Sequence, residues 1–265
     1  MAINKEGNGY TFGFAALMVI LVGASLAMVS IGLKPEIKKN EADKKMMDIL
    51  SSIGVDSERS TAADVFNSVV KERILIDASG EVISSATGQV DPTNSEDPFN
   101  VDVKKQYKQM ISKIVQANKN DKETLIDLVS QQPVEYPLFR CEKEGEEFYV
   151  VPMVGTGLWG PIWGYVAMQE DMKTVYGASF DHKTETPGLG AEIKEDFFEE
   201  QFVGESTYKE GDFVSIAVVK GTSKAENKNA VDGITGGTIT SNGVGEMVYR
   251  TMAIYDNYFK KQRTL

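Results

Sequence analysis

The chain has 265 residues, with 28 lysines and arginines against 39 aspartates and glutamates, so its formal net charge is −11. This acidic composition disfavours nucleic-acid binding, because contacts to phosphates need a basic surface. A single cysteine, Cys141, and a single histidine, His182, exclude an intrachain disulfide, a self-contained cysteine-ligated iron–sulfur cluster and a cysteine–histidine zinc site. Any redox chemistry of this chain would therefore use an organic cofactor.

The first predicted element is a membrane helix. No charged residue occurs between Glu6 and Lys34, and the apolar stretch 10–33 exceeds the roughly 20 residues that a helix needs to cross a bilayer. A cleavable signal peptide is the alternative, but its apolar region is usually only about 7–15 residues long. We therefore expect a short tail over residues 1–9, a single transmembrane helix over 10–33 and a soluble domain over 34–265.

Charge leaves the orientation of this helix open. Lysines follow the apolar stretch at positions 34, 38, 39, 44 and 45, whereas only Lys5 precedes it. A positive-inside count would keep the large domain in the cytoplasm. That rule is weak here, because long domains translocate largely regardless of charge and acidic residues are interspersed among these lysines.

The first half of the soluble part shows mainly helical patterns. We expect a helix over 34–53, a second helix after a cap at Ser60 or Thr61, and a hairpin made of strands 74–76 and 82–83. Residues 86–122 are polar, which predicts an irregular excursion with one helical piece near 103–115. A further helical turn is expected at 124–129.

The second half is richer in strand patterns. Strands are predicted over 136–141, 148–151, 162–168 and 175–180, and the nearly all-apolar run 214–219 is typical of a central strand. Phenylalanines at helical spacing in the acidic run 195–202 predict an amphipathic surface helix. The chain is expected to fold as α+β, with one domain that has a central mixed or antiparallel sheet and a C-terminal helix.

The segment 155–160, GTGLWG, matches the pattern G-x-G-x-x-G. The dinucleotide fingerprint requires a helix to begin at these glycines, whereas Pro161 and a predicted strand follow here. We therefore interpret the segment as a glycine-rich turn between two strands. Both tryptophans of the chain, Trp159 and Trp163, lie close together in sequence, which is compatible with an aromatic pocket or with core packing.

A second polar segment, HKTETPGLG at 182–190, contains a Pro-Gly turn. A lone histidine such as His182 is usually structural. Thr186 and the main-chain amides around Gly188 could hydrogen-bond a polar ring edge, and Leu189 could pack on an aromatic face.

The third segment, 232–243, combines hydroxyls, glycines and Asp232 directly before apolar residues at helical spacing. The terminal helix is therefore expected to begin after a cap at Thr240, Ser241 or Asn242. Main-chain amides and the dipole at such a helix start favour a phosphate. Plain capping after a glycine-rich loop accounts for the same pattern.

Together these segments resemble a known family. The N-terminal apolar stretch, GLWG at 157–160, ETPGLG at 185–190 and TGGT at 235–238 resemble the C subunit of the Na⁺-translocating NADH:quinone reductase and its relative, the G subunit of the Rnf-type electron transport complex. The string ETPGLG, followed by the threonine motif, is specific, and the resemblance covers most of the chain.

The family's flavin-attachment pattern is roughly D-x-x-[ST]-G-A-[ST]. Asp232, Thr235, Gly236 and Thr238 match it, whereas Gly237 stands in place of the usual alanine. The resemblance implies that Thr238 is esterified to the phosphate of FMN by a dedicated flavin transferase. It also implies that this transferase recognises Asp232.

The resemblance also suggests which side chains contact the isoalloxazine ring. Thr186 and Leu189 are expected to lie against it, with Leu158 and Trp159 as further candidates. No catalytic residue and no metal ligand is expected in this chain.

The implied function is that of a one-electron carrier subunit in the inner membrane, with its soluble domain on the periplasmic side. Electrons from NADH would pass through its FMN towards quinone while the whole complex exports Na⁺. Its partners would be the sister subunits, the membrane and the flavin transferase. Two alternatives stay open: the G subunit of an Rnf-type complex, and a flavin-free membrane-anchored assembly or ligand-binding protein.

Overall fold

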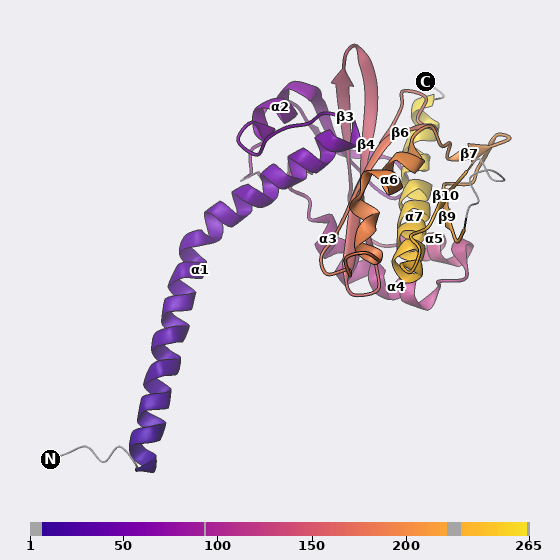
Figure 1. Ribbon diagram of the computed structural model, residues 1–265. Helices are drawn as coiled ribbons and strands as arrows, with labels where there is room; N and C mark the ends of the chain where they lie inside the picture. The colour runs from indigo at the N-terminus through magenta and orange to yellow at the C-terminus, as the bar shows by residue number, and fades with distance from the viewer. Residues whose placement is uncertain (1–6, 93, 222–228, 264–265) are drawn as a thin grey trace. The chain divides into compact units, whose positions relative to one another are not determined.

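The structure is a computed structural model that describes residues 7–92, 94–221 and 229–263 (Figure 1). The chain divides into two compact units, Met1–Lys44 and Lys45–Leu265. Helix α1 (Asn8–Ser52) makes up most of the first unit and confirms the helix predicted over 34–53. It is long and apolar enough to cross a membrane, a test that an N-terminal signal sequence also passes. Most of the predicted tail 1–9 lies outside the described residues.

A six-stranded sheet forms the centre of the second unit, in the order β2-β1-β3-β4-β5-β6. All five neighbouring pairs are antiparallel. The strands are β1 (Val70–Ile76), β2 (Val82–Ala86), β3 (Tyr136–Lys143), β4 (Glu146–Thr156), β5 (Pro161–Met168) and β6 (Val175–His182). The predicted hairpin, the four predicted strands between 136 and 180 and the α+β fold with a C-terminal helix are thereby confirmed.

The remaining elements are short, apart from the terminal helix. They are α2 (Ala62–Val69), η1 (Pro98–Asn100), α3 (Val103–Gln106), η2 (Tyr107–Ile111), α4 (Ser112–Ala117), α5 (Lys122–Ser130), η3 (Gly190–Lys194), α6 (Asp196–Glu199), η4 (Glu200–Phe202) and α7 (Thr238–Arg263). Two small sheets pair β7 (Tyr208–Lys209) with β8 (Asp212–Phe213) and β9 (Ala217–Val219) with β10 (Ala230–Asp232). The helical pieces predicted near 103–115 and 124–129 are confirmed.

The apolar run 214–219 was predicted to be a central strand, and this prediction is wrong. Only β9 is extended, and it pairs in parallel with β10 outside the main sheet. Ser215 has a φ of 61°, a left-handed conformation that interrupts an extended strand. Val218 packs against the core and β9 contacts α7, so the run is apolar because it covers a helix.

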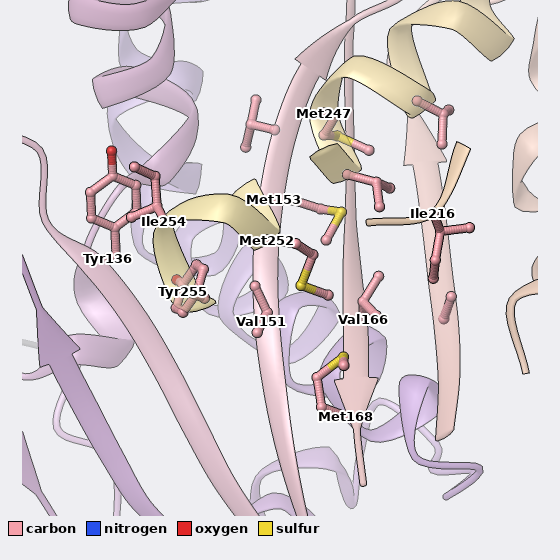
Figure 2. Packing of buried hydrophobic residues seen from close by; sticks show 14 of the residues in the cluster. Tyr136, Val151, Met153, Val166, Met168, Ile216, Met247, Met252, Ile254 and Tyr255 are labelled. Carbon is pink, nitrogen blue, oxygen red and sulfur yellow. The ribbon is translucent and has the colours of Figure 1, made fainter. Parts of the chain in front are cut away.

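Helix α7 packs on one face of the sheet, directly over β4 (Figure 1). Figure 2 shows its side chains Met247 and Met252 gathered with Met153 and Val166 of the sheet in one buried cluster. Tyr255, also buried, donates a hydrogen bond from its hydroxyl to the Pro137 carbonyl over 2.6 Å. This packing fixes α7 along its length.

The opposite face of the sheet is also covered. Phe66 of α2, Phe99 of η1 and Phe139 of β3 form an edge-to-face cluster with ring centroids 5.4 to 6.4 Å apart. Arg73 and Asp97 are also buried, and the Arg73 guanidinium donates two hydrogen bonds of 2.8 and 2.7 Å to the Asp97 carboxylate. The sheet therefore lies between two packed layers, which is why β4 is buried over eight successive residues.

The acidic run 195–202 forms α6 and η4 in place of one continuous helix. Phe198 and Phe202 are buried against Phe180 of β6, as the amphipathic pattern predicted. Glu199 is half-buried and accepts a hydrogen bond from the Phe180 amide over 2.5 Å. Burial, reinforced by the nearby Asp196, Asp48 and Asp181 carboxylates, raises the pKa of Glu199 to about 7.

A Glu199→Gln substitution should stabilise the protein at pH 8 and leave its stability unchanged at pH 4. Between about pH 4.5 and 7 the unfolded chain releases the Glu199 proton while the native state retains it, so stability falls as pH rises through this window. We expect a gain of about 1–2 kcal/mol at pH 8, after a discount for solvent screening. Urea denaturation of the full chain in detergent measures the free energy of unfolding of both proteins. An equal gain at both pH values would contradict the raised pKa of Glu199.

Candidate functional site

Helix α7 begins at Thr238, so the cap predicted at Thr240, Ser241 or Asn242 is wrong. The first intrahelical bond runs from the Ser241 amide to the Gly237 carbonyl over 2.9 Å. The hydroxyls of Thr240 and Ser241 form tertiary contacts, and that of Ser241 accepts from the Ile234 amide over 2.9 Å. The main-chain amides of residues 238–240 therefore have no intrahelical acceptor and, with the helix dipole, form a place for an anion.

The loop between β10 and α7 brings the predicted attachment residues to the surface. A hydrogen bond of 2.7 Å from the Gly233 amide to the Val219 carbonyl and a turn from Gly237 to Ile234 define its course. Thr235, Gly236 and Thr238 are exposed, and Asp232 is partly exposed. The hydroxyl-bearing residues of this loop are therefore accessible to a modifying enzyme.

This loop lies in close contact with the segment 186–190. A Cβ added at Gly236, which has a φ of 78°, would lie 2.6 Å from Cδ2 of Leu189. A Cβ added at Gly237 would lie 3.2 Å from the Gly190 amide nitrogen. Glycine at both positions lets the two loops approach closely without such tight contacts.

The segment 186–190 is the Pro-Gly turn that the sequence predicted. The amides of Leu189 and Ala191 both donate to the Thr186 carbonyl, over 3.1 and 3.2 Å. The Gly188 amide donates to the Glu192 carboxylate over 2.8 Å. Thr186 is exposed, and Leu189 has 41 % of its surface in solvent despite being apolar.

The glycine-rich segment 155–160 forms the turn between β4 and β5, closed by a hydrogen bond of 2.8 Å from the Gly157 amide to the Gly160 carbonyl. No helix follows it, which confirms the prediction of a strand-to-strand turn. Leu158 and Trp159 are exposed at 49 % and 65 %. Trp163 instead packs against the core under the Lys104 ammonium group, so the two tryptophans differ in environment.

Glu185 joins these three segments, although sequence patterns assigned no role to it. Its buried carboxylate accepts a hydrogen bond from the Trp159 amide over 2.8 Å and another from the Thr240 hydroxyl over 2.6 Å. Its own amide donates to Nδ1 of His182 over 3.2 Å. His182 thus has a structural contact, at the end of β6. In the sequence, Glu185 stood out only as the first residue of the ETPGLG string, without a role of its own.

Exposed apolar side chains surround the start of α7. They are Leu158, Trp159, Leu189 and Ile239, and we call them the apolar rim. The rim residues come from three segments that Glu185 and the glycine contacts hold together. Polar main-chain amides and an apolar surface therefore lie side by side, as a ligand with a phosphate and a flat apolar ring would require.

A groove of about 410 Å³ follows the other predicted residues, Asp232 and Thr235. Phe197, Glu192 and Gln201 line it as well, and the Gln201 side chain accepts a hydrogen bond from the Asp232 amide over 2.9 Å. None of the rim residues lines this groove. Within the described part of the chain, no group of three or more histidine, cysteine, aspartate or glutamate side chains could hold a metal ion.

Comparisons with known proteins point to one family. The model of the FMN-binding domain family matches residues 157–253, which contain all three segments of the site. The C subunit of the Na(+)-translocating NADH-quinone reductase from Vibrio campbellii is 26% identical over 246 residues, 92% of this chain and 90% of that protein. The C subunit from Yersinia pestis is 28% identical over 253 residues, with the same coverage.

Solved structures agree with this likeness. The crystal structure of NqrC from Shewanella oneidensis is 23% identical, has a TM-score of 0.64 and shares the fold. The crystal structure of the C subunit from Parabacteroides distasonis is 34% identical, has a TM-score of 0.66, and covers 86% of this chain and 96% of its own. On this identity and coverage, the chain belongs to the family formed by the C subunit of the Na(+)-translocating NADH-quinone reductase.

Proposed function

We propose that this chain carries FMN on Thr238 through a phosphodiester bond and relays electrons from NADH towards quinone within a Na⁺-translocating NADH:quinone reductase. The observation that carries the proposal is the position of Thr238. Its exposed side chain belongs to the first residue of a 26-residue helix, beside three main-chain amides without an intrahelical acceptor. A phosphodiester attached there would be anionic and would lie at the positive end of the helix dipole.

The apolar rim fits the other end of FMN. The isoalloxazine ring supplies the electron chemistry when FMN is bound, and the protein orients it. Leu189 and Thr186 would lie against the ring, with Leu158 and Trp159 as further contacts. Their exposure supports this role, because large apolar side chains around a polar helix start are otherwise unfavourable in water.

The attachment loop suits a modifying enzyme. Thr235, Gly236 and Thr238 are exposed, and Asp232 faces the groove of about 410 Å³. A flavin transferase would recognise Asp232 and this loop before it joins the FMN phosphate to the Thr238 hydroxyl. Gly237 replaces the family's usual alanine, and it lies where a Cβ would be only 3.1 Å from Ile234.

The rest of the proposal concerns the membrane. We infer a tail at 1–9, a transmembrane segment at 10–33 and a soluble domain at 34–265 on the periplasmic side of the inner membrane, in contact with sister subunits. The length and apolar composition of α1 support the span. The relatives favour this complex over the Rnf type, and the match to an FMN-binding family disfavours a flavin-free assembly protein.

Covalent attachment is tested by co-expression of the full chain with a flavin transferase. After denaturing electrophoresis, the wild type and Thr238→Ser should fluoresce under ultraviolet light, because both have a hydroxyl at the attachment position. Thr238→Ala should be dark. Thr235→Ala is the matched control in the same loop and should keep its fluorescence. A dark wild-type band beside a transferase shown to be active on another substrate would contradict the proposal.

The place of the ring is tested on the flavin-loaded protein. Leu189→Ala should leave the covalent band intact but increase the quenching of flavin fluorescence by iodide, because about 1 kcal/mol of apolar contact with the ring is lost. Phe197→Ala is the control: it also removes an exposed apolar side chain, but one that lines the groove. If only Phe197→Ala increased quenching, the ring would occupy the groove and the rim assignment would be wrong.

A further inference from the structure

The Glu185 carboxylate is almost fully buried, with 5 % of the residue's surface exposed. Both of its oxygens accept hydrogen bonds, Oε1 from the Trp159 amide and Oε2 from the Thr240 hydroxyl, as an ionised carboxylate does. Among the described residues, no lysine or arginine forms an ion pair with it. The positive end of the α7 dipole is the compensating charge, because Thr240 lies in the first turn of that helix.

Two glycines create the space for this carboxylate. A Cβ added at Gly157 would lie 2.6 Å from Oε1, and one added at Gly190 would lie 2.6 Å from Oε2. The Cβ added at Gly190 would also lie 2.5 Å from the Thr240 hydroxyl oxygen. The carboxylate therefore lies where two glycines leave room for it, at the point where the three segments of the site meet.

This contact connects three segments that are far apart in sequence, and a hydrogen bond of 3.1 Å from the Thr184 hydroxyl to the Trp159 carbonyl adds to it. Trp159 belongs to the β4–β5 turn, Glu185 to the segment after β6, and Thr240 to the start of α7, two residues after Thr238. An apolar contact could also join them, and without the cost of burying a charge. What a carboxylate adds is directional hydrogen bonds to both neighbours and a negative charge beside the helix start.

We propose that Glu185 is a positioning residue of the flavin site: it holds the rim residue Trp159 and the attachment turn of α7 in one fixed arrangement, and its negative charge lowers the reduction potential of the FMN on Thr238. This inference rests on the function proposed above. A fixed negative charge disfavours the addition of electrons to a nearby ring. The hydrogen bonds prevent the carboxylate from turning away from the site.

Glu185→Gln removes the negative charge of the side chain but keeps its hydrogen bonds to Trp159 and Thr240. The glutamine oxygen can accept from the Trp159 amide while its NH₂ group donates to the Thr240 oxygen. The Thr240 hydroxyl, whose hydrogen can rotate, then accepts from this group instead of donating. The variant should carry covalent flavin like the wild type, and reduction should become about tenfold more favourable, which is a potential about 60 mV higher for a one-electron couple.

The matched control is Glu192→Gln. Glu192 is also close to the site and accepts a hydrogen bond from the Gly188 amide, but it is only partly buried, so solvent screens its charge. Its substitution should leave the potential within error of the wild type. Equal potentials in the wild type, Glu185→Gln and Glu192→Gln would overturn the electrostatic part of the proposal.

Positioning is tested without flavin, in the full chain expressed in the absence of the transferase. Amide hydrogen exchange at Trp159 should accelerate at least about tenfold in Glu185→Ala, because the carboxylate that accepts from this amide is lost. It should accelerate likewise in Thr240→Val, because the carboxylate then loses the hydroxyl that fixes it. It should stay slow in Glu185→Gln and Thr240→Ser. Unchanged exchange in all four variants would overturn the positioning role. A dark wild-type band in the fluorescence experiment would overturn the proposed function separately, because the exchange measurement needs no flavin.

Discussion

The close approach of α7 to the end of β4 is the contact on which the site depends. A Cβ added at Gly155 would lie 2.9 Å from Cβ of Met247, and one added at Gly243 would overlap the Thr156 carbonyl oxygen. Glycine at both positions lets the helix lie directly on the strand, so the first turn of α7 lies beside the turn that follows β4. Glu185 then has both neighbours within hydrogen-bonding distance, and the loop between β10 and α7 and the apolar rim come together as a consequence.

Most of the fold could be predicted because its signals are local. The strands between 136 and 180 alternate with turns of glycine and charged residues, and the buried face of α7 repeats at helical spacing. The predictions that proved wrong concern places where tertiary contacts override such signals. Ser215 adopts a left-handed conformation that no pattern indicates, and the hydroxyls of Thr240 and Ser241 form tertiary contacts although their residue types favour capping.

The site was predictable in its parts but not in its assembly. The strings at 157–160, 185–190 and 235–238 were identified through resemblance, and each is a surface turn in the structure. The Glu185 carboxylate joins Trp159 to Thr240 through long-range packing. Neither the spacing of residues nor the composition of the chain indicates such a contact. The tight surroundings of Gly237 are likewise set by packing, because a Cβ there would lie 3.1 Å from Ile234 and 3.2 Å from the Gly190 amide nitrogen.

The charge distribution supports the covalent bond that we propose at this site. Tight noncovalent phosphate sites commonly use arginine or lysine in addition to main-chain amides. Here none of the three segments of the site, 157–160, 185–190 and 232–240, contains a lysine or arginine, and the chain as a whole has a net charge of −11. The buried Glu185 carboxylate already occupies part of the favourable field at the start of α7. Main-chain amides and the helix dipole alone would hold a free phosphate weakly beside these negative charges. A bond to Thr238 would retain FMN, and the Glu185 charge could then adjust the reduction potential of the flavin without causing its loss.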